Sequence, residues 1–265
     1  MRAVAICCTV GRPQLSLLLG MWALQRVQLP LFIALDVDAT RWLPDNPVGL
    51  AYSSDMPLGA SRWAKPGPPG DTQWVAQRAP ERVRREAYPR TIGPLRAWAV
   101  EQAIGLWELD ERTDAFLVLD DDDYYSPDHA RSTLRAMHDH PGCVVGARDT
   151  GILWQAGQQA PDLVVGGPYG PGPHATWGVP FRTYRAAGGY QADPVEDLAL
   201  LSRVGWQGAR NHADVTHVRY QYNTDSFSAT KGDRAAGLPS EELVLVPHMT
   251  SAQEYLARWC SARMP

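Results

Sequence analysis

Short runs of apolar residues alternate with polar turns along the first part of the chain. Ala3–Cys8 and Leu31–Leu35 are uninterrupted apolar runs of strand length, which predicts strands buried on both faces. Between them, a leucine-rich segment from Pro13 to about Leu24 predicts a helix. Val48–Tyr52 is a weaker candidate for a third strand. This order of elements predicts an α/β fold with a mainly parallel, doubly wound central sheet flanked by helices.

Other segments follow helical periodicity. Gly93–Leu109 repeats apolar residues every three or four positions, which predicts a helix with one apolar face. Asp193 and Glu196 have the spacing of a capping box and predict a helix start, as do Ser251 and Glu254 for a final amphipathic helix. Further short strands are expected at Cys143–Gly146, Ile152–Trp154, Val215–Tyr222 and Leu243–Val246.

The segment Ser53–Tyr88 interrupts this rhythm. Lys65–Gly70 is so rich in proline and glycine that it excludes a helix and a central strand. Arg78–Arg85 is rich in arginine and is expected to form a short exposed helix. A segment of this kind is either a mobile loop over a site or an inert surface excursion, and the sequence leaves both interpretations open.

Four consecutive acids form the most distinctive polar pattern. Phe116–Leu119 predicts a buried strand, and it runs directly into Asp120–Asp123. Ser126 and Pro127 then predict the cap and first residue of a helix. Adjacent carboxylates repel one another, and a bound Mg²⁺ or Mn²⁺ would relieve that repulsion at the end of a strand, where ligands commonly bind. A solvated acidic turn is the alternative.

Composition narrows the class of protein without naming a partner. The 265 residues are 45% hydrophobic and 20% charged, as in globular chains that bury a large core. A net charge of −4 gives no general attraction to nucleic acid or anionic membranes. The apolar run Leu15–Leu24 is far shorter than a membrane span, so we expect neither an anchor nor export.

The cysteines show neither metal-ligand spacing nor a disulfide pattern. Reduced thiols of this kind favour the cytoplasm, so we expect a cytoplasmic protein. The four cysteines are Cys7, Cys8, Cys143 and Cys260.

Several charged residues outside the acidic run have two interpretations each. Arg96 lies near the start of a predicted helix, where an arginine either binds phosphate or is simply solvated. Glu196 either caps its helix or takes part in chemistry, and Asp197, beside it in the first turn, is a candidate general base. His217 either completes a carboxylate-held metal site or makes ordinary hydrogen bonds.

Four segments within Ala3–Ser228 together resemble the GT-A glycosyltransferases, and most closely those of the family 2 type. The resemblance implies a GT-A-like single domain, with a nucleotide-sugar-binding half over residues 1–124 and an acceptor-binding half with a C-terminal helix over 125–265. The segments are AICCTVGRP (Ala5–Pro13), ALDVDAT (Ala34–Thr40), FLVLDDDDYYSP (Phe116–Pro127) and WGVPFRTYRAAGGYQ…VEDLALLSRVG (Trp177–Gly205).

The resemblance also implies a reaction. Asp120 and Asp122 fall on the D-x-D positions that hold Mn²⁺ or Mg²⁺, with Asp122 as the direct ligand. Tyr222 stands where the family commonly has histidine, so His217 is the substitute third ligand. Asp197 falls on the position of the general base, which takes the proton of an acceptor hydroxyl in an inverting displacement.

Substrate contacts follow from the same resemblance. The donor would be a nucleoside-diphosphate sugar, with a UDP-sugar as the default, and Asp36 or Asp38 would meet its base or ribose. The acceptor stays open among a saccharide, a lipid-linked sugar, a protein and a modified nucleic acid. The further residues expected at the substrates are Thr9, Arg12, Arg96, Asp120, Asp121 and Trp177, with Glu196 beside the base.

Other functions fit parts of the sequence. Asp36-x-Asp38-x-Thr40 matches the signature of haloacid dehalogenase-like phosphatases, in which Asp36 would be the nucleophile and Lys65 the charge-balancing lysine. That interpretation leaves the Glu196–Asp197 region without a role. A nucleotidyltransferase would need a glycine-rich, lysine-bearing loop after the first strand, which is missing here. A catalytically silent nucleotide- or sugar-binding domain is the non-enzymatic alternative.

Overall fold

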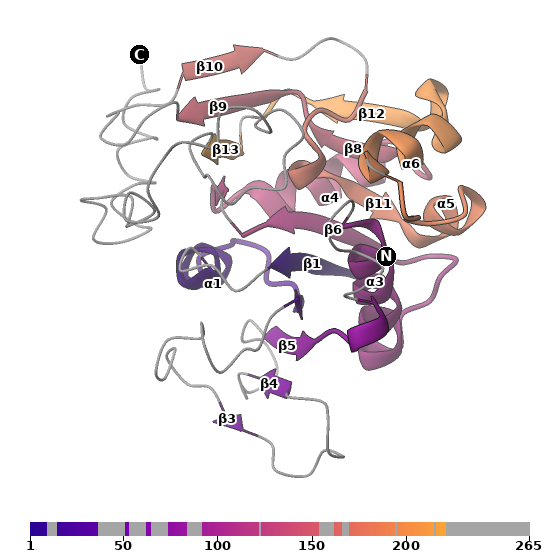
Figure 1. The fold of residues 1–265 in the computed structure, drawn as a ribbon. Coiled ribbons are helices and arrows are strands. Elements are labelled where there is room, and N and C mark those ends of the chain that lie inside the picture. Colours follow the sequence, from indigo (N-terminus) through magenta and orange to yellow (C-terminus); the bar gives the residue numbers. More distant parts are fainter. Residues whose placement is uncertain are drawn as a thin grey trace, which may run out of the picture.

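The computed structural model describes residues 1–9, 15–36, 51–52, 62–64, 74–83, 92–121, 123–153, 162–165, 170–193, 195–214 and 216–220. These residues form one α/β domain in which a large sheet lies between layers of helices (Figure 1). In the part of the chain described, no helix is both long enough and apolar enough to cross a membrane.

Four parallel strands form the middle of the main sheet. Their order is β6-β1-β2-β5, and the apolar runs of the sequence account for the first three. Strand β5 was not predicted from the sequence, because its segment follows a proline- and glycine-rich stretch and ends in polar residues. The four strands are β1 (Ala3–Thr9), β2 (Leu31–Leu35), β5 (Trp74–Arg78) and β6 (Ala115–Asp120).

Mixed pairing extends this sheet on both sides. Among the described residues the full order is β12-β8-β11-β6-β1-β2-β5-β4-β3, and β11 runs antiparallel to both of its neighbours. A smaller sheet has the order β10-β9-β13-β7. The remaining strands are β3 (Ala51–Tyr52), β4 (Arg62–Ala64), β7 (Tyr124–Tyr125), β8 (Val144–Ala147), β9 (Asp149–Leu153), β10 (Asp162–Val165), β11 (Gly178–Pro180), β12 (Ala209–His212) and β13 (His217–Tyr220).

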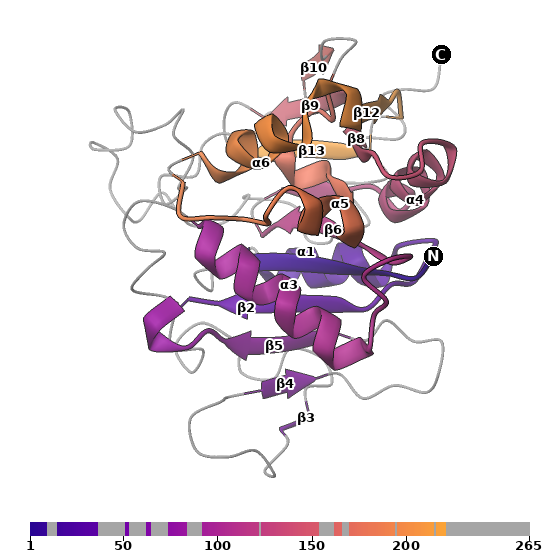
Figure 2. The same cartoon turned by 90° about the vertical axis from the view of Figure 1, so that its right-hand side faces the viewer.

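Helices cover both faces of the main sheet, as a doubly wound fold requires. Alternate residues of β1 point to opposite faces, so that Cys7 joins the apolar cluster with α1 and Cys8 joins the cluster with α3. Figure 2 shows α3 in front of the parallel strands and α1 behind them. The two helices are α1 (Leu15–Ala23) and α3 (Gly93–Trp107).

Three further helices cover the second half of the sheet. Apolar side chains of α5 and α6 pack in the same cluster as those of α3, while α4 packs against β8 and β11. Met137 of α4 is buried against the sheet, as its apolar periodicity predicts. The bounds are α4 (His129–Asp139), α5 (Phe181–Ala186) and α6 (Glu196–Val204).

The predicted helix starts were wrong in two places. The helix α4 begins at His129 and is preceded by Asp128, two residues later than the Ser126–Pro127 signal indicates. The helix α6 begins at Glu196 without any side-chain cap, so the predicted capping box is not formed. At the start of α6, a tertiary contact with Arg96 uses the side chain of Glu196 that local spacing assigned to capping.

Two other expectations concern the arginine-rich segment and the C-terminal elements. The predicted helix over Arg78–Arg85 is wrong at its start, because Arg78 ends strand β5; residues 81–83 are helical. The expected strand at Leu243–Val246 and the final helix after Ser251 lie outside the described residues.

Candidate active site

The parallel strands β1, β2 and β6 end at the same edge of the main sheet, and polar residues follow all three. In the β1–β6 register, Cys8 lies opposite Asp120. The backbone N–H of Asp36, directly after β2, donates to the carbonyl oxygen of Thr9 at 2.9 Å. Thr9, Asp36 and Asp120, all expected at the substrates, therefore gather at the carboxyl edge, where α/β proteins bind their ligands.

The acids of the run point in different directions. Asp121 is 3% exposed and accepts a hydrogen bond from the hydroxyl of Thr9. Asp123 is 5% exposed and contacts His217, whereas the side chain of Asp120 is 34% exposed. Asp122 lies outside the described residues. Among the three acids described, Asp120 is therefore the one open to a ligand.

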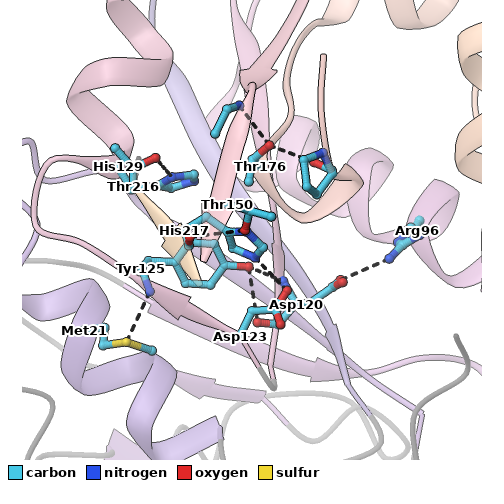
Figure 3. Close-up of polar contacts among 12 residues, drawn as sticks. Met21, Arg96, Asp120, Asp123, Tyr125, His129, Thr150, Thr176, Thr216 and His217 are labelled. Atoms are coloured by element: carbon cyan, nitrogen blue, oxygen red, sulfur yellow. Dashed lines mark hydrogen bonds and ion pairs between the residues drawn. The ribbon is translucent and has the colours of Figure 1, made fainter. Parts of the chain in front are cut away.

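Tyr125 shapes the turn that carries these acids. Its hydroxyl oxygen accepts a hydrogen bond from the backbone N–H of Asp120 at 2.8 Å. Its ring lies beside the rings of His129 and His217, with centroids 4.8 and 5.5 Å away (Figure 3). Burial raises the pKa of Tyr125 well above its ordinary value, so the phenol stays protonated and holds the end of β6 in place.

Arg96 joins two acids that come from distant segments. From α3, one terminal nitrogen (Nη2) lies 3.1 Å from Oδ1 of Asp120, and the other (Nη1) is paired with Oε1 of Glu196 at the start of α6. Figure 3 shows Arg96 reaching from α3 toward Asp120. The side chains of Arg96 and Glu196 are each 9% exposed, so this ion pair is buried.

Burial and charge act against each other in this ion pair. Burial raises the pKa of Glu196, and the positive charge of Arg96 opposes that rise. Burial also works against the charge of Arg96, but Asp120 and Glu196 outweigh it and raise the pKa of Arg96 above its ordinary value. Arg96 therefore stays charged and compensates both carboxylates.

A second polar chain starts from Asp123. Its Oδ2 lies 2.8 Å from Nε2 of His217, and Nδ1 of the same ring lies 2.7 Å from the hydroxyl oxygen of Thr150 (Figure 3). His217 is fully buried, and both of its ring nitrogens have partners. The metal role expected for His217 would require one of these two hydrogen bonds to break.

Two aromatic residues pack against each other near Arg96. Trp177 was expected at the substrate, whereas His174 had no signal in the sequence. Trp177, expected as a substrate contact, is buried, and its Nε1 donates to the carbonyl oxygen of Gly172 at 2.9 Å. Its ring packs against His174, whose Nε2 lies 2.7 Å from the hydroxyl of Tyr190. These contacts place Trp177 in the core beneath the site.

Nucleophilic catalysis by Cys8 does not fit this site. Burial raises the pKa of the Cys8 thiol to about 12, so the thiolate is scarce at neutral pH. Cys7, Cys8 and Cys143 are not joined in disulfides, in line with the reduced cysteines that the sequence predicts.

Asp197 follows Glu196 in the first turn of α6 and is less buried. One of its carboxylate oxygens accepts a hydrogen bond from the N–H of Leu198 at 2.8 Å. Exposure rises along this turn, from buried Glu196 through half-buried Asp197 to Leu198, which is 59% exposed.

The carboxyl edge fits a metal ion that is held jointly with phosphates. Within the described residues, no three His, Cys, Asp or Glu side chains are grouped so that they hold a metal ion by themselves. One oxygen of Asp120 contacts Arg96, and the half-exposed side chain can present the other to a cation. Mg²⁺ beside phosphates is commonly held by one or two carboxylates, with phosphate oxygens and water as the other ligands.

Some residues named from the sequence lie outside the described part of the chain. They are Arg12, Asp38, Lys65 and Asp122. The phosphatase alternative depends on two of them, Asp38 and Lys65. The residues that the sequence gave no reason to select are Thr150 and His174, because isolated polar residues without a motif carry no signal for a site.

The sheet order, the helices on both faces and the acids at the carboxyl edge define an α/β domain with a GT-A-like fold. The sequence matches no protein-family model and no curated protein. Among solved structures, it is similar to S. aureus TarS, with a TM-score of 0.50 and 13% sequence identity, covering 83% of this chain and 37% of that chain.

A second similar structure contains a nucleotide sugar. S. aureus TarS 1-349 in complex with UDP-GlcNAc has a TM-score of 0.50 and 12% identity, covering 86% of this chain and 61% of that chain. At this level of identity the likeness shows the fold alone. The chain therefore has the GT-A-like fold and spans less than two thirds of the length of either TarS chain.

Proposed function

We propose that the protein is a metal-dependent, inverting glycosyltransferase that moves a sugar from a nucleoside-diphosphate sugar to an acceptor hydroxyl. The observation that carries this proposal is the position of Asp120. It is an open carboxylate at the carboxyl end of a central parallel strand, and Arg96 links it to the first turn of α6, which bears Asp197. The GT-A-like fold supports the same class of enzyme.

The donor would bind along the carboxyl edge. Thr9 ends β1 and Asp36 directly follows β2, and the two lie together at this edge of the sheet. The complex of TarS with UDP-GlcNAc supports a nucleotide sugar as donor, and a UDP-sugar is our first choice. The acceptor is a saccharide, a lipid-linked sugar, a protein or a modified nucleic acid.

A metal ion held by Asp120 and Asp122 with the two phosphates would offset the negative charge that develops on the leaving nucleoside diphosphate. Asp120 keeps one oxygen for that ion because Arg96 takes the other. Buried Asp121 and Asp123 hold the turn in shape through Thr9 and His217.

Asp197 would act as the general base. It would accept the proton of the acceptor hydroxyl as that oxygen forms its bond to the anomeric carbon and the bond to the phosphate oxygen breaks. This in-line displacement inverts the anomeric configuration and needs no covalent intermediate. Glu196 is less suited to this role, because its carboxylate is buried and paired with Arg96.

Nucleotide binding tests the donor site first. The stability of the parent protein and of Asp122→Ala would be measured by thermal shift with UDP, GDP, TDP and CDP, each with and without Mn²⁺. We expect one of them to raise the melting temperature of the parent in a metal-dependent way, and the variant to lose this effect. Asp139→Ala, which removes an exposed acid of α4, is the matched control. Absence of stabilisation by all four would contradict the proposal.

Turnover tests the base. With the matching nucleotide sugar and water as acceptor, release of the nucleoside diphosphate would be measured for the parent and Asp197→Asn. We expect the variant to bind the donor normally and to react about 100 to 10,000 times more slowly, as is usual when a general base is removed. Release at the parent rate would exclude Asp197 as the base.

A further inference from the structure

The guanidinium group of Arg96 has little room for a substrate. One terminal nitrogen contacts Asp120 and the other contacts Glu196, and the side chain is 9% exposed. An arginine that binds donor phosphates must present its nitrogens to the cleft. Arg96 instead directs both toward carboxylates of its own chain, so its contacts differ from the phosphate contact that the sequence suggests.

The chain around Arg96 is packed closely enough to transmit its position. A methyl group on Gly93, at the start of α3, would lie 1.8 Å from the carbonyl oxygen of Gln191 and 3.2 Å from Cβ of Glu196. The first turn of α3 is therefore pressed against the segment that leads into α6. Arg96 lies one turn further along α3 and bonds to the first residue of α6.

The ion pair also decides how α6 is rotated. Successive residues of an α-helix point about 100° apart. Because the carboxylate of Glu196 is fixed inward on Arg96, Asp197 is turned aside toward the rim, where it is half-buried. Without Arg96, buried Glu196 would lose the charge that compensates it, and the hydrogen bond of its carboxylate to its own backbone N–H would not tie α6 to α3.

We propose that Arg96 is a positioning residue: it ties the metal-side carboxylate Asp120 to the first turn of α6 and so sets the place of Asp197 relative to the donor. This role rests on the proposed function. Arg96 touches neither the donor nor the acceptor. It acts by holding two segments, which lie 24 and 100 residues from it in the sequence, in one geometry.

Hydrogen exchange of the substrate-free protein tests the structural half of this proposal. The amide of Ala199 donates to the carbonyl oxygen of Val195 at 2.9 Å, in the first hydrogen-bonded turn of α6. We expect Arg96→Met to speed the exchange of this turn by about tenfold or more, while β1 and β6 exchange as in the parent. Unchanged exchange in this turn would overturn the proposal.

Kinetics with the donor tests the functional half. We expect Arg96→Met to leave the dissociation constant of the nucleoside diphosphate within about threefold of the parent and to lower kcat by about 100-fold, since small misplacements of a catalytic group have effects of this size. Arg96→Lys should recover part of kcat, because an ammonium group reaches one carboxylate at a time. A loss of nucleotide affinity as large as the loss of turnover would overturn the proposal and make Arg96 a phosphate ligand.

Two further variants separate positioning from general damage. Arg203→Met removes an arginine of α6 itself, which donates to the carbonyl oxygens of Ala187 and Gly189 at 2.8 Å but does not contact Asp120. We expect it to keep kcat near the parent value. If Arg96→Met fails to fold, Arg96→Met/Glu196→Met removes both buried charges and should fold, yet keep the low kcat. Normal turnover in this double variant would contradict the positioning role.

The two proposals fail in different ways. If the parent binds no nucleoside diphosphate, the proposed function falls, and the exchange of α6 still decides whether Arg96 holds this helix. If the parent binds and reacts but Arg96→Met behaves like the parent in exchange and turnover, the function stands and the positioning role falls.

Discussion

The carboxylate of Glu196 faces into the protein, where burial raises its pKa and Arg96 opposes that rise. Local spacing suggested that this residue caps its own helix by reaching back along the chain. The cap is not formed, because an arginine 100 residues earlier in the sequence offers a stronger, charge-assisted partner. A single buried ion pair thus overrides a local preference of the helix start.

Replacing Glu196 tests how much this pair stabilises the fold. We expect Glu196→Gln to lower the free energy of unfolding by about 3 kcal/mol, because it leaves the buried charge of Arg96 less compensated. Glu101→Gln is the matched control, since Glu101 pairs with Arg185 at the surface, and it should cost less than about 1 kcal/mol. Urea denaturation at pH 7.5 measures both values. Equal losses of unfolding free energy in the two variants would show that the buried ion pair stabilises the fold no more than the surface pair does.

At the scale of elements, strand β8 is pressed closely against the loop before η2 (His174–Thr176). The N–H of Ala147 donates to the hydroxyl oxygen of Thr176 at 3.0 Å. A methyl group on Gly146 would lie 2.0 Å from the carbonyl oxygen of Pro171 and 2.8 Å from the same hydroxyl oxygen. The absence of a side chain at Gly146 therefore lets this loop seat against the sheet.

Gly146→Ala tests this close approach. We expect it to lower the free energy of unfolding by about 1–3 kcal/mol, because backbone must move to make room for the methyl group. Gly105→Ala is the opposite case. Gly105 is at an exposed position of α3 and its new methyl group would meet nothing within 4 Å, so the substitution should raise the free energy of unfolding by about 0.5–1 kcal/mol. Thermal unfolding of both variants measures the difference. A neutral Gly146→Ala would mean that the loop shifts freely.

Buried strands were the elements easiest to predict. Every residue of β1, β2 and β6 is buried except Asp120 at the end of β6, so hydrophobicity alone marks these strands. Strand β5 escaped prediction because Gln77 and Arg78 end it and its pairing with β2 is a long-range contact. The start of α6 was misplaced for a similar reason, since Arg96, 100 residues away, pairs with the side chain of Glu196 that was expected to cap.

The candidate site was predictable in kind but not in arrangement. Four acids after a buried strand indicate a ligand-binding edge, yet nothing local distinguishes open Asp120 from buried Asp121 and Asp123. Their orientations depend on Thr9 and His217, which are 112 and 94 residues away in the sequence. A sequence without aligned relatives gives no information on pairs so far apart.

At the scale of the whole molecule, buried histidines make stability depend on pH. Burial lowers the pKa of His129 and of His174 well below the ordinary value of 6.5. Both therefore stay neutral in the folded protein, and His174 bonds to the hydroxyl of Tyr190 in that form. In the unfolded chain both take up protons near pH 6.5.

The folded protein should consequently lose stability as the pH falls below 6.5. A histidine whose pKa is lower in the folded than in the unfolded state stabilises the fold at pH values above its unfolded pKa. Below that pH, the stabilisation is lost at about 1.4 kcal/mol per pH unit for each histidine. Urea denaturation at pH 7.5, 6.5 and 5.5 measures the slope. We expect His174→Gln to reduce this slope, whereas His138→Gln, on the exposed side of α4, should leave it unchanged. Glu196, whose pKa is raised, has the opposite effect: its contribution to stability falls as the pH rises above 4.5. A stability that does not change with pH and is not affected by His174→Gln would contradict the prediction.

The pairs that assemble the site also determine when it appears during folding. Thr9 with Asp121, Arg96 with Glu196 and Asp123 with His217 each close a loop of 94 to 112 residues. Helices, and strand pairs such as β1 with β2, form through much shorter loops and therefore earlier. A refolding chain should regain its helical signal before it regains ligand binding. A chain that stops short of β13 would keep most of the main sheet and lose the partner of Asp123.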